Sequence, residues 1–212
     1  MRKFSDEDRE RIRAELLETA RELLLKYGPA KTTVKDITEP VGIAKPTFYQ
    51  FFDAKSDLYV EIFEQELDEF AKTLQSELEG SNDAQERLEQ FFCCYVEFGE
   101  GNEFIQEVFI KRDYQEVLGN VSSDQLTEIE RKEMEVLVPP IKDIQARSEG
   151  PISEMEPITV LGLMGSSLGL LILHKDEYDE IGANLEEIQD GIYYHLQEEM
   201  IATLSRGLTV EN

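Results

Sequence analysis

The stretch TTVKDITEPVGIAKPTFYQFFDAK, residues 32–55, decides the fold of this chain. It predicts two short helices joined by a tight turn. Thr33 is placed to cap the first helix, with Asp36 at capping-box spacing three residues later. Gly42 then provides the corner, because glycine adopts a positive φ without steric cost.

A second short helix is predicted to begin near Lys45, because Pro46 fits a first helical turn, where its missing N–H costs little. Phe48 and Phe52 are four residues apart, so they share one inward face. The residues left on the outward face are polar: Lys45, Thr47, Tyr49 and Gln50. A short helix with aromatic anchors behind it and hydrogen-bond donors in front suits the major groove of DNA.

This segment resembles the DNA-binding signature of the tetracycline-repressor (TetR) family, roughly T-x-x-x-I-A-x-x-A-G-V-S-x-G-T-x-Y-x-Y-F-x-x-K-x-x-L. The matching residues are Ile37, Gly42, Ile43, Thr47, Tyr49, Phe52, Lys55 and Leu58. The departures are Thr38, Pro40, Val41, Ala44 and Pro46. Ala44 removes a capping serine worth about 1 kcal/mol, and Pro40 is expected to shorten the first helix. The family implies an all-α dimeric regulator with a helix-turn-helix.

The face and the resemblance together indicate DNA contacts of two kinds. The residues expected to reach base edges are Lys45, Thr47 and Gln50, with Pro46 changing how closely the backbone approaches. The residues expected to bind phosphates are Thr33, Lys35, Tyr49 and Lys55. A lysine at position 55 opposes the dipole of the helix that begins there, which a phosphate would compensate. Phe51 contacts a thymine methyl or is partly buried; both interpretations stay open.

Helical periodicity accounts for the rest of the chain and predicts no strands. One expected helix is capped by Asp53 and runs to residue 78. The others span 5–27, 84–98, 104–117, 122–145 (kinked or split at Pro139 and Pro140), 155–174 and 185–206. The prediction is therefore an all-α fold: a three-helix DNA-binding domain over residues 1–55 and a helical effector-binding and dimerisation domain over 56–212.

The last two expected helices are candidates for a homodimer interface. Gly162, Gly165 and Gly169 are small residues at helical spacing, which would let another helix approach closely. The next helix contributes the apolar residues Ile188, Ile192 and Leu196. Two helices from each subunit would form a four-helix interface, as the resemblance implies. The alternative is that the glycines serve packing within one chain.

Aromatic residues of the middle helices are candidates for an effector pocket: Phe91, Tyr95, Phe98, Phe104, Phe109 and Tyr114. Such a cluster either lines an apolar pocket between helices or forms ordinary core. An apolar or cationic effector fits the apolar lining and the acidic surroundings.

The net charge of −25 is unusual for a DNA-binding protein. Residues 1–60 carry 11 of the 21 basic and 11 of the 46 acidic residues, so the excess of acid lies in residues 61–212. This asymmetry would orient the chain on a duplex. The acidity indicates a host with a salty cytoplasm, or else a DNA mimic that binds a basic partner.

The sequence predicts neither an enzyme nor a cofactor-binding protein. The charged N-terminal residues do not read as a secretion signal, the apolar run 158–173 is short for a membrane span, and adjacent Cys93 and Cys94 point apart, so a cytoplasmic protein is expected. No spacing of metal ligands, phosphate loop or nucleophile elbow is present. The expected function is a repressor that a small molecule releases from a near-palindromic operator. The alternative is an acidic interaction protein whose helix-turn-helix no longer binds DNA.

Overall fold

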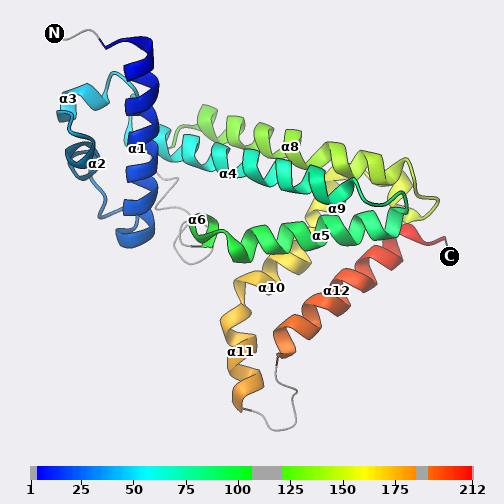
Figure 1. The fold of residues 1–212 in the computed structure, drawn as a ribbon. Helices are drawn as coiled ribbons and strands as arrows, with labels where there is room; N and C mark the ends of the chain where they lie inside the picture. The colour runs from blue at the N-terminus through cyan, green and yellow to red at the C-terminus, as the bar shows by residue number, and fades with distance from the viewer. Residues whose placement is uncertain (1–3, 107–120, 185–190, 212) are drawn as a thin grey trace. The chain divides into compact units, whose positions relative to one another are not determined.

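The computed structural model of the chain describes residues 4–106, 121–184 and 191–211, and the regular secondary structure within these ranges is entirely helical (Figure 1). The prediction of an all-α fold is confirmed. The chain divides into two compact units. The first comprises Met1–Leu67 and Glu103–Lys132, and the second comprises Asp68–Asn102 and Glu133–Asn212.

The first unit is built around its N-terminal helix. Its helices are α1 (Asp6–Tyr27), α2 (Val34–Val41), α3 (Lys45–Phe48), α6 (Glu103–Ile105) and the first parts of α4 (Lys55–Leu78) and α8 (Ser123–Gln145). Ser5 caps α1 through a reciprocal pair of hydrogen bonds with Asp8, as its position predicts. α1 lies against α2, as Figure 1 shows, and buries a stripe at helical spacing: Ile12, Leu16, Leu17, Ala20 and Leu24.

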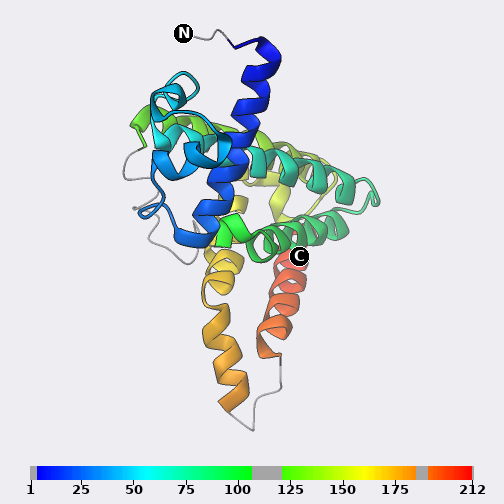
Figure 2. The ribbon, with the colours of Figure 1, turned by 60° about the vertical axis from the view of Figure 1, so that its left-hand side comes forward.

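The second unit holds the remaining helices. They are α5 (Ala84–Gly101), a 3-10 turn (Pro151–Glu154), α9 (Pro157–Met164), a π-helical segment (Gly165–Gly169), α10 (Leu170–Leu173), α11 (Lys175–Asn184) and α12 (Ile192–Thr209), with the later parts of α4 and α8. α12 packs against α5, and α11 lies beside α12 in both views (Figures 1 and 2).

Helix α5 continues beyond the break expected at Gly99 and ends at Gly101. Gly99 is buried, and a Cβ atom built on it would lie 3.0 Å from Ile172 Cδ1. This glycine therefore allows close packing against α10 instead of ending the helix. The helix expected over 104–117 falls mostly outside the described residues, which contain only α6 of it.

Helix α8 runs from Ser123 to Gln145 without ending at Pro139 and Pro140, so of the two expected outcomes, a kink or a split, the split is wrong. Each proline removes one backbone donor. Ile141 directly follows the prolines, Ile144 lies three residues further on, and both are fully buried, so packing of this segment outweighs the lost hydrogen bonds.

The helix expected over 155–174 is divided into α9, the π-helical segment and α10. α11 was not expected, because its residues are mostly polar and show no clear apolar stripe. The described part of α12 starts at Ile192, and residues 185–190 lie outside the described residues. No single described helix has the length and apolarity to cross a membrane; one pair, Pro157–Leu173 with Lys175–Gly182, meets those criteria only when taken together across a 55° bend.

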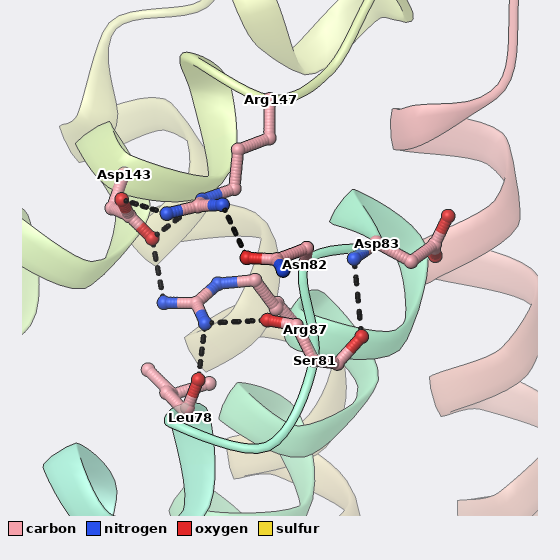
Figure 3. Close-up of polar contacts among 7 residues, drawn as sticks. All are labelled: Leu78, Ser81, Asn82, Asp83, Arg87, Asp143 and Arg147. Carbon is pink, nitrogen blue, oxygen red and sulfur yellow. Dashed lines mark hydrogen bonds and ion pairs between the residues drawn. The ribbon is translucent and has the colours of Figure 1, made fainter.

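A polar cluster in the second unit joins the end of α4 to the end of α8 (Figure 3). The Arg87 guanidinium donates to the carbonyl oxygens of Leu78 and Ser81 and, at 2.6 Å, to Asp143 Oδ2. Arg147 Nε donates to the same carboxylate oxygen at 3.0 Å. The hydrogen bond from Arg147, and the nearby charge of Arg87, hold the pKa of Asp143 below its ordinary value. The carbonyl group at the end of α4, that of Leu78, and one in the following loop, that of Ser81, thereby gain a donor.

Candidate nucleic-acid interface

The corner between α2 and α3 has the predicted geometry. Thr33 Oγ1 accepts the Asp36 N–H at 3.3 Å, and Asp36 Oδ2 accepts the Thr33 N–H at 2.9 Å. Gly42 follows with φ 74° and ψ 24°, in the left-handed region. Nothing lies within 4 Å of a Cβ built on Gly42, so the backbone angle, not space, requires glycine there. Pro40 is accommodated inside α2, which ends one residue later at Val41.

Two aromatic rings hold the second helix from behind. Phe48 is fully buried and Phe52 is 4% exposed, with ring centroids 5.4 Å apart. Ile37 of α2 is fully buried as well. Residues 45–52, the recognition segment from here on, consist of the four-residue helix α3 and the turn after it. Ala44 makes no side-chain cap, as its replacement of a capping serine predicts.

The recognition segment presents its polar face outward. The exposed members are Lys45, Pro46, Tyr49 and Gln50, whereas Thr47 is half-buried. Tyr49 is 49% exposed, and its ring stands edge-on to Phe48, 5.4 Å between centroids. Thr33 and Lys35 are exposed at the start of α2. All eight residues expected to contact DNA, Lys55 included, are thus at least partly accessible, and all lie within the first unit.

The cation of Lys55 at the start of α4 has partners within the chain, in addition to the phosphate expected from the sequence. Its ammonium donates to the carbonyl oxygens of Pro29 and Thr32, each at 2.7 Å, and lies 5.3 Å from the centre of the Tyr59 ring. Carbonyl oxygens of the α1–α2 connection therefore compensate for a cation at the start of α4. A phosphate is not needed to explain lysine at this position, and Lys55 ties the two segments together.

Arg9 and Arg13 of α1 reach the far end of the recognition segment, a role that sequence reasoning missed. Arg9 Nη2 donates to the Gln50 carbonyl and Arg13 Nη1 to the Phe51 carbonyl, both at 3.0 Å. Phe51 is half-buried, which agrees with the second of its two interpretations. The partners are separated by 41 and 38 residues, so no local pattern reveals them.

A hollow of about 290 Å³ borders the recognition segment. Tyr49 and Gln50 are among its lining residues. Its other lining residues include four carboxylates: Asp53, Asp57, Glu61 and Glu64. Carboxylates repel phosphates, so Tyr49 and Gln50 mark the edge of the surface that a duplex could approach.

Four of the aromatic residues expected around an effector lie in the described part of the chain, and all four are buried or half-buried. Phe91 and Phe104 are buried, Tyr95 is half-buried, and Phe98 stacks on Phe70 with ring centroids 4.5 Å apart. Phe109 and Tyr114 lie outside the described residues. A separate groove of about 310 Å³ on α4 and α5 is lined by different residues: Glu77, Glu86, Glu89, Gln90, Cys93, Cys94 and Glu97. Burial and nearby glutamates raise the pKa of Cys94 to about 11, so its thiol stays protonated near neutral pH.

The glycines expected at a dimer interface differ in their surroundings. Gly162 and Gly165 are exposed, and a Cβ on either would meet nothing within 4 Å. Gly169 packs within the chain, since its Cβ would lie 2.9 Å from Tyr95 Oη. Ile192 and Leu196 are half-buried, and Ile188 lies outside the described residues. The helical run 157–173, which holds the three glycines, also has exposed apolar residues: Ile158, Leu163, Leu170 and Leu173.

Comparisons with known proteins agree with this site. Residues 16–62 match the model of the bacterial regulatory proteins of the tetR family. Over 160 residues, 76% of this chain and 70% of the relative, the chain is 22% identical to the HTH-type transcriptional activator FasR of Mycolicibacterium smegmatis.

Solved structures share the fold. A TetR-family transcriptional regulator of Pectobacterium atrosepticum superposes with a TM-score of 0.64 at 24% identity, over 98% of this chain and 99% of that one. The regulator FadR of Bacillus subtilis, solved with stearoyl-CoA, gives a TM-score of 0.63 at 14% identity, over 92% and 98% of the two chains.

A glycine corner, a buried aromatic anchor and an outward polar face define a helix-turn-helix, and the protein is a DNA-binding transcriptional regulator. Its DNA-binding segment, residues 16–62, is similar to that of the bacterial regulatory proteins of the tetR family. Regulators of this family bind operator DNA and act as dimers.

Proposed function

We propose that this regulator binds a near-palindromic operator as a homodimer and represses transcription until a small molecule releases it. The outward face of the recognition segment carries the proposal. In it Lys45, Thr47 and Gln50 read base edges, while Tyr49, with Thr33 and Lys35 of α2, holds phosphates. Buried Phe48 and Phe52 fix the direction of that face.

The two-fold axis is proposed to pass through α9, α10 and α12. An exposed row of small and apolar side chains, among them Gly162, Gly165 and Leu170, supports this. An open apolar row of this kind is unusual on a monomer. Two recognition segments related by the axis would read half-sites about one or more helical turns apart.

A small apolar or cationic ligand is proposed as the effector, bound by the helical domain over residues 56–212, with residues 1–55 as the DNA-binding domain. One similar structure, FadR of Bacillus subtilis, was solved with stearoyl-CoA, which supports an apolar ligand. A coupling of about 1–3 kcal/mol between the two sites would change operator affinity many-fold. FasR is an activator, so the direction of control is part of the proposal. The protein acts in the cytoplasm and without catalysis.

A mobility shift tests the proposal, with duplex DNA from upstream of the protein's own gene and constant salt. Tyr49→Ala and Lys45→Ala should each weaken the shift about tenfold, since each removes a contact worth about 1–3 kcal/mol. The matched control is Tyr27→Ala, because Tyr27 is 45% exposed, like Tyr49 at 49%, but lies outside the proposed face.

Lys55→Ala is a poor probe, because it also breaks two hydrogen bonds inside the unit. A shift that neither Tyr49→Ala nor Lys45→Ala changes would refute the assigned face. Absence of any shift, together with capture of a basic protein partner, would favour the acidic interaction protein instead.

A further inference from the structure

Two arginines of α1 lie behind the recognition segment and bind its last carbonyl groups. Besides the hydrogen bonds to Gln50 and Phe51, each guanidinium lies over an aromatic ring. Arg9 Cζ is 5.1 Å from the centre of the Phe51 ring, and Arg13 Cζ is 4.5 Å from that of Phe52. The two arginines are four residues apart and so extend from the same face of α1.

The carbonyl groups need these donors because α3 is short. Helix α3 ends at Phe48, and the N–H groups of Gln50 and Phe51 donate back to the carbonyls of Thr47 and Phe48. The carbonyls of Gln50 and Phe51 lie beyond that last turn, where the end of a helix carries partial negative charge. A guanidinium from another helix satisfies them both by hydrogen bonding and by charge.

The arginines are themselves held in place. Arg13 pairs with Glu61 of α4, Nε to Oε1 at 2.8 Å with a second contact from Nη2. The Phe4 ring also packs against Phe51, with centroids 6.3 Å apart. α4 therefore fixes Arg13 before any DNA arrives, and both arginines bind the end of the recognition segment.

We propose that Arg9 and Arg13 are positioning residues for DNA binding. They hold the backbone at Gln50 and Phe51, so that the polar face keeps the direction in which it meets base edges. They act through the recognition segment and not through a phosphate. The inference rests on the proposed placement of that segment in the major groove.

Arginine-to-lysine substitutions distinguish a positioning residue from a direct phosphate ligand, because lysine keeps the charge but lacks the planar guanidinium and its stacking surface. A direct phosphate ligand tolerates the exchange, whereas a positioning residue does not. Arg11 is a matched control on the same helix. It is 58% exposed and pairs only locally, with Glu15 at 2.8 Å and Asp8 at 3.6 Å.

The experiment uses the full chain and the duplex that the unaltered protein enriches from a random-sequence library. Fluorescence anisotropy gives the affinity across KCl concentrations of about 50–200 mM, where each phosphate contact contributes about one unit to the log–log salt slope. Arg9→Lys and Arg13→Lys should each bind about tenfold more weakly at every salt concentration, with an unchanged slope. Arg11→Lys should bind like the unaltered chain.

Melting curves verify that each variant is folded, and Arg9→Lys, at an exposed position, retains the fold in any case. Phe51→Leu supplies a second test, since it removes the ring under Arg9 without changing charge; it should weaken binding and leave the slope unchanged. The inference is overturned if the lysine variants bind normally while Arg9→Ala and Arg13→Ala lose about one unit of slope. Normal binding by every variant also overturns it. If the unaltered chain enriches no duplex, the proposed function fails, and the inference falls with it.

Discussion

At the residue scale, some residue types are explained by their neighbours in the sequence, and others by contacts with residues far away in the sequence. Local reasons are visible in the sequence. Thr33 caps α2 and Gly42 turns the chain, because each depends on its near neighbours. Distant reasons are not visible. Arg9 and Lys55 bind carbonyl oxygens 41 and 26 residues away, at places known only once the helices cross. The expectation that a phosphate accounts for Lys55 rests on its local position alone and does not include these carbonyl partners.

Gly42 gives a prediction at this scale. Gly42→Ala should destabilise the chain by about 1–2 kcal/mol, because alanine at φ 74° suffers the clash of left-handed backbone. Gly42→Asn should cost less, because asparagine tolerates that region. Urea unfolding measures both changes.

The control for this prediction is Gly80→Ala. Gly80 has no positive φ, and its added Cβ would meet nothing closer than Glu77 O at 4.0 Å. Equal losses for Gly42→Ala and Gly80→Ala would show that backbone strain is not the reason for glycine at the corner.

At the element scale, apolar periodicity predicted the helices that bury a stripe and missed the others. α1 buries a stripe of large apolar residues, and α12 packs against α5. Both helices are predicted by the repeat of apolar residues along the sequence. α11 has no such stripe, and α8 passes through two prolines because the residues after them are buried. Gly99 was expected to end a helix and Gly169 to face a second subunit, yet both permit close crossings of α5 with the helical run 157–173. Only the crossing explains them.

The Arg87 cluster gives a prediction for the join between elements. Arg87→Met should cost about 2–3 kcal/mol in urea unfolding, because its side chain is only 11% exposed and leaves the Leu78 and Ser81 carbonyls without this donor. Arg147→Met is the comparison, because it pairs with the same Asp143 carboxylate from a 35% exposed position.

Arg147→Met should therefore cost clearly less than Arg87→Met, since exposed ion pairs contribute little. If the two substitutions were equally harmful, the shared carboxylate and not the carbonyl groups would hold the join together. Because the pKa of Asp143 is lowered in the folded chain, its contribution is present above its ordinary value of 3.8 and is lost as the pH falls through the lowered one.

At the scale of the whole molecule, charge is the feature that the fold leaves unexplained. The chain carries a net charge of −25, because its 46 acidic residues far outnumber its 21 basic ones, and only part of the carboxylates can pair with a cation as Asp143 does. Dissolved cations are expected to screen the mutual repulsion of the others. The suggestion of a high-salt host stays a prediction.

The melting temperature, measured at different KCl concentrations, tests the prediction of a high-salt host. Raising KCl from about 0.1 to 1 M shortens the Debye length from about 10 to 3 Å, so the melting temperature should rise. Replacing Glu86, Glu89 and Glu97 by Gln in the 310 Å³ groove should reduce that rise, because less repulsion remains to be screened. A melting temperature that falls with added KCl would contradict the prediction.

Gly150 lies against the backbone of Thr209, the last residue of α12. A Cβ built there would fall 2.3 Å from the carbonyl carbon of Thr209, and Ser148 Oγ donates to the Thr209 carbonyl oxygen at 3.1 Å. Since the obstacle is main chain, no rotamer change can relieve it. In a mutational scan with survival of the fold as the criterion, position 150 should therefore stay invariant while Gly101 and Gly207, with open space around them, accept many substitutions.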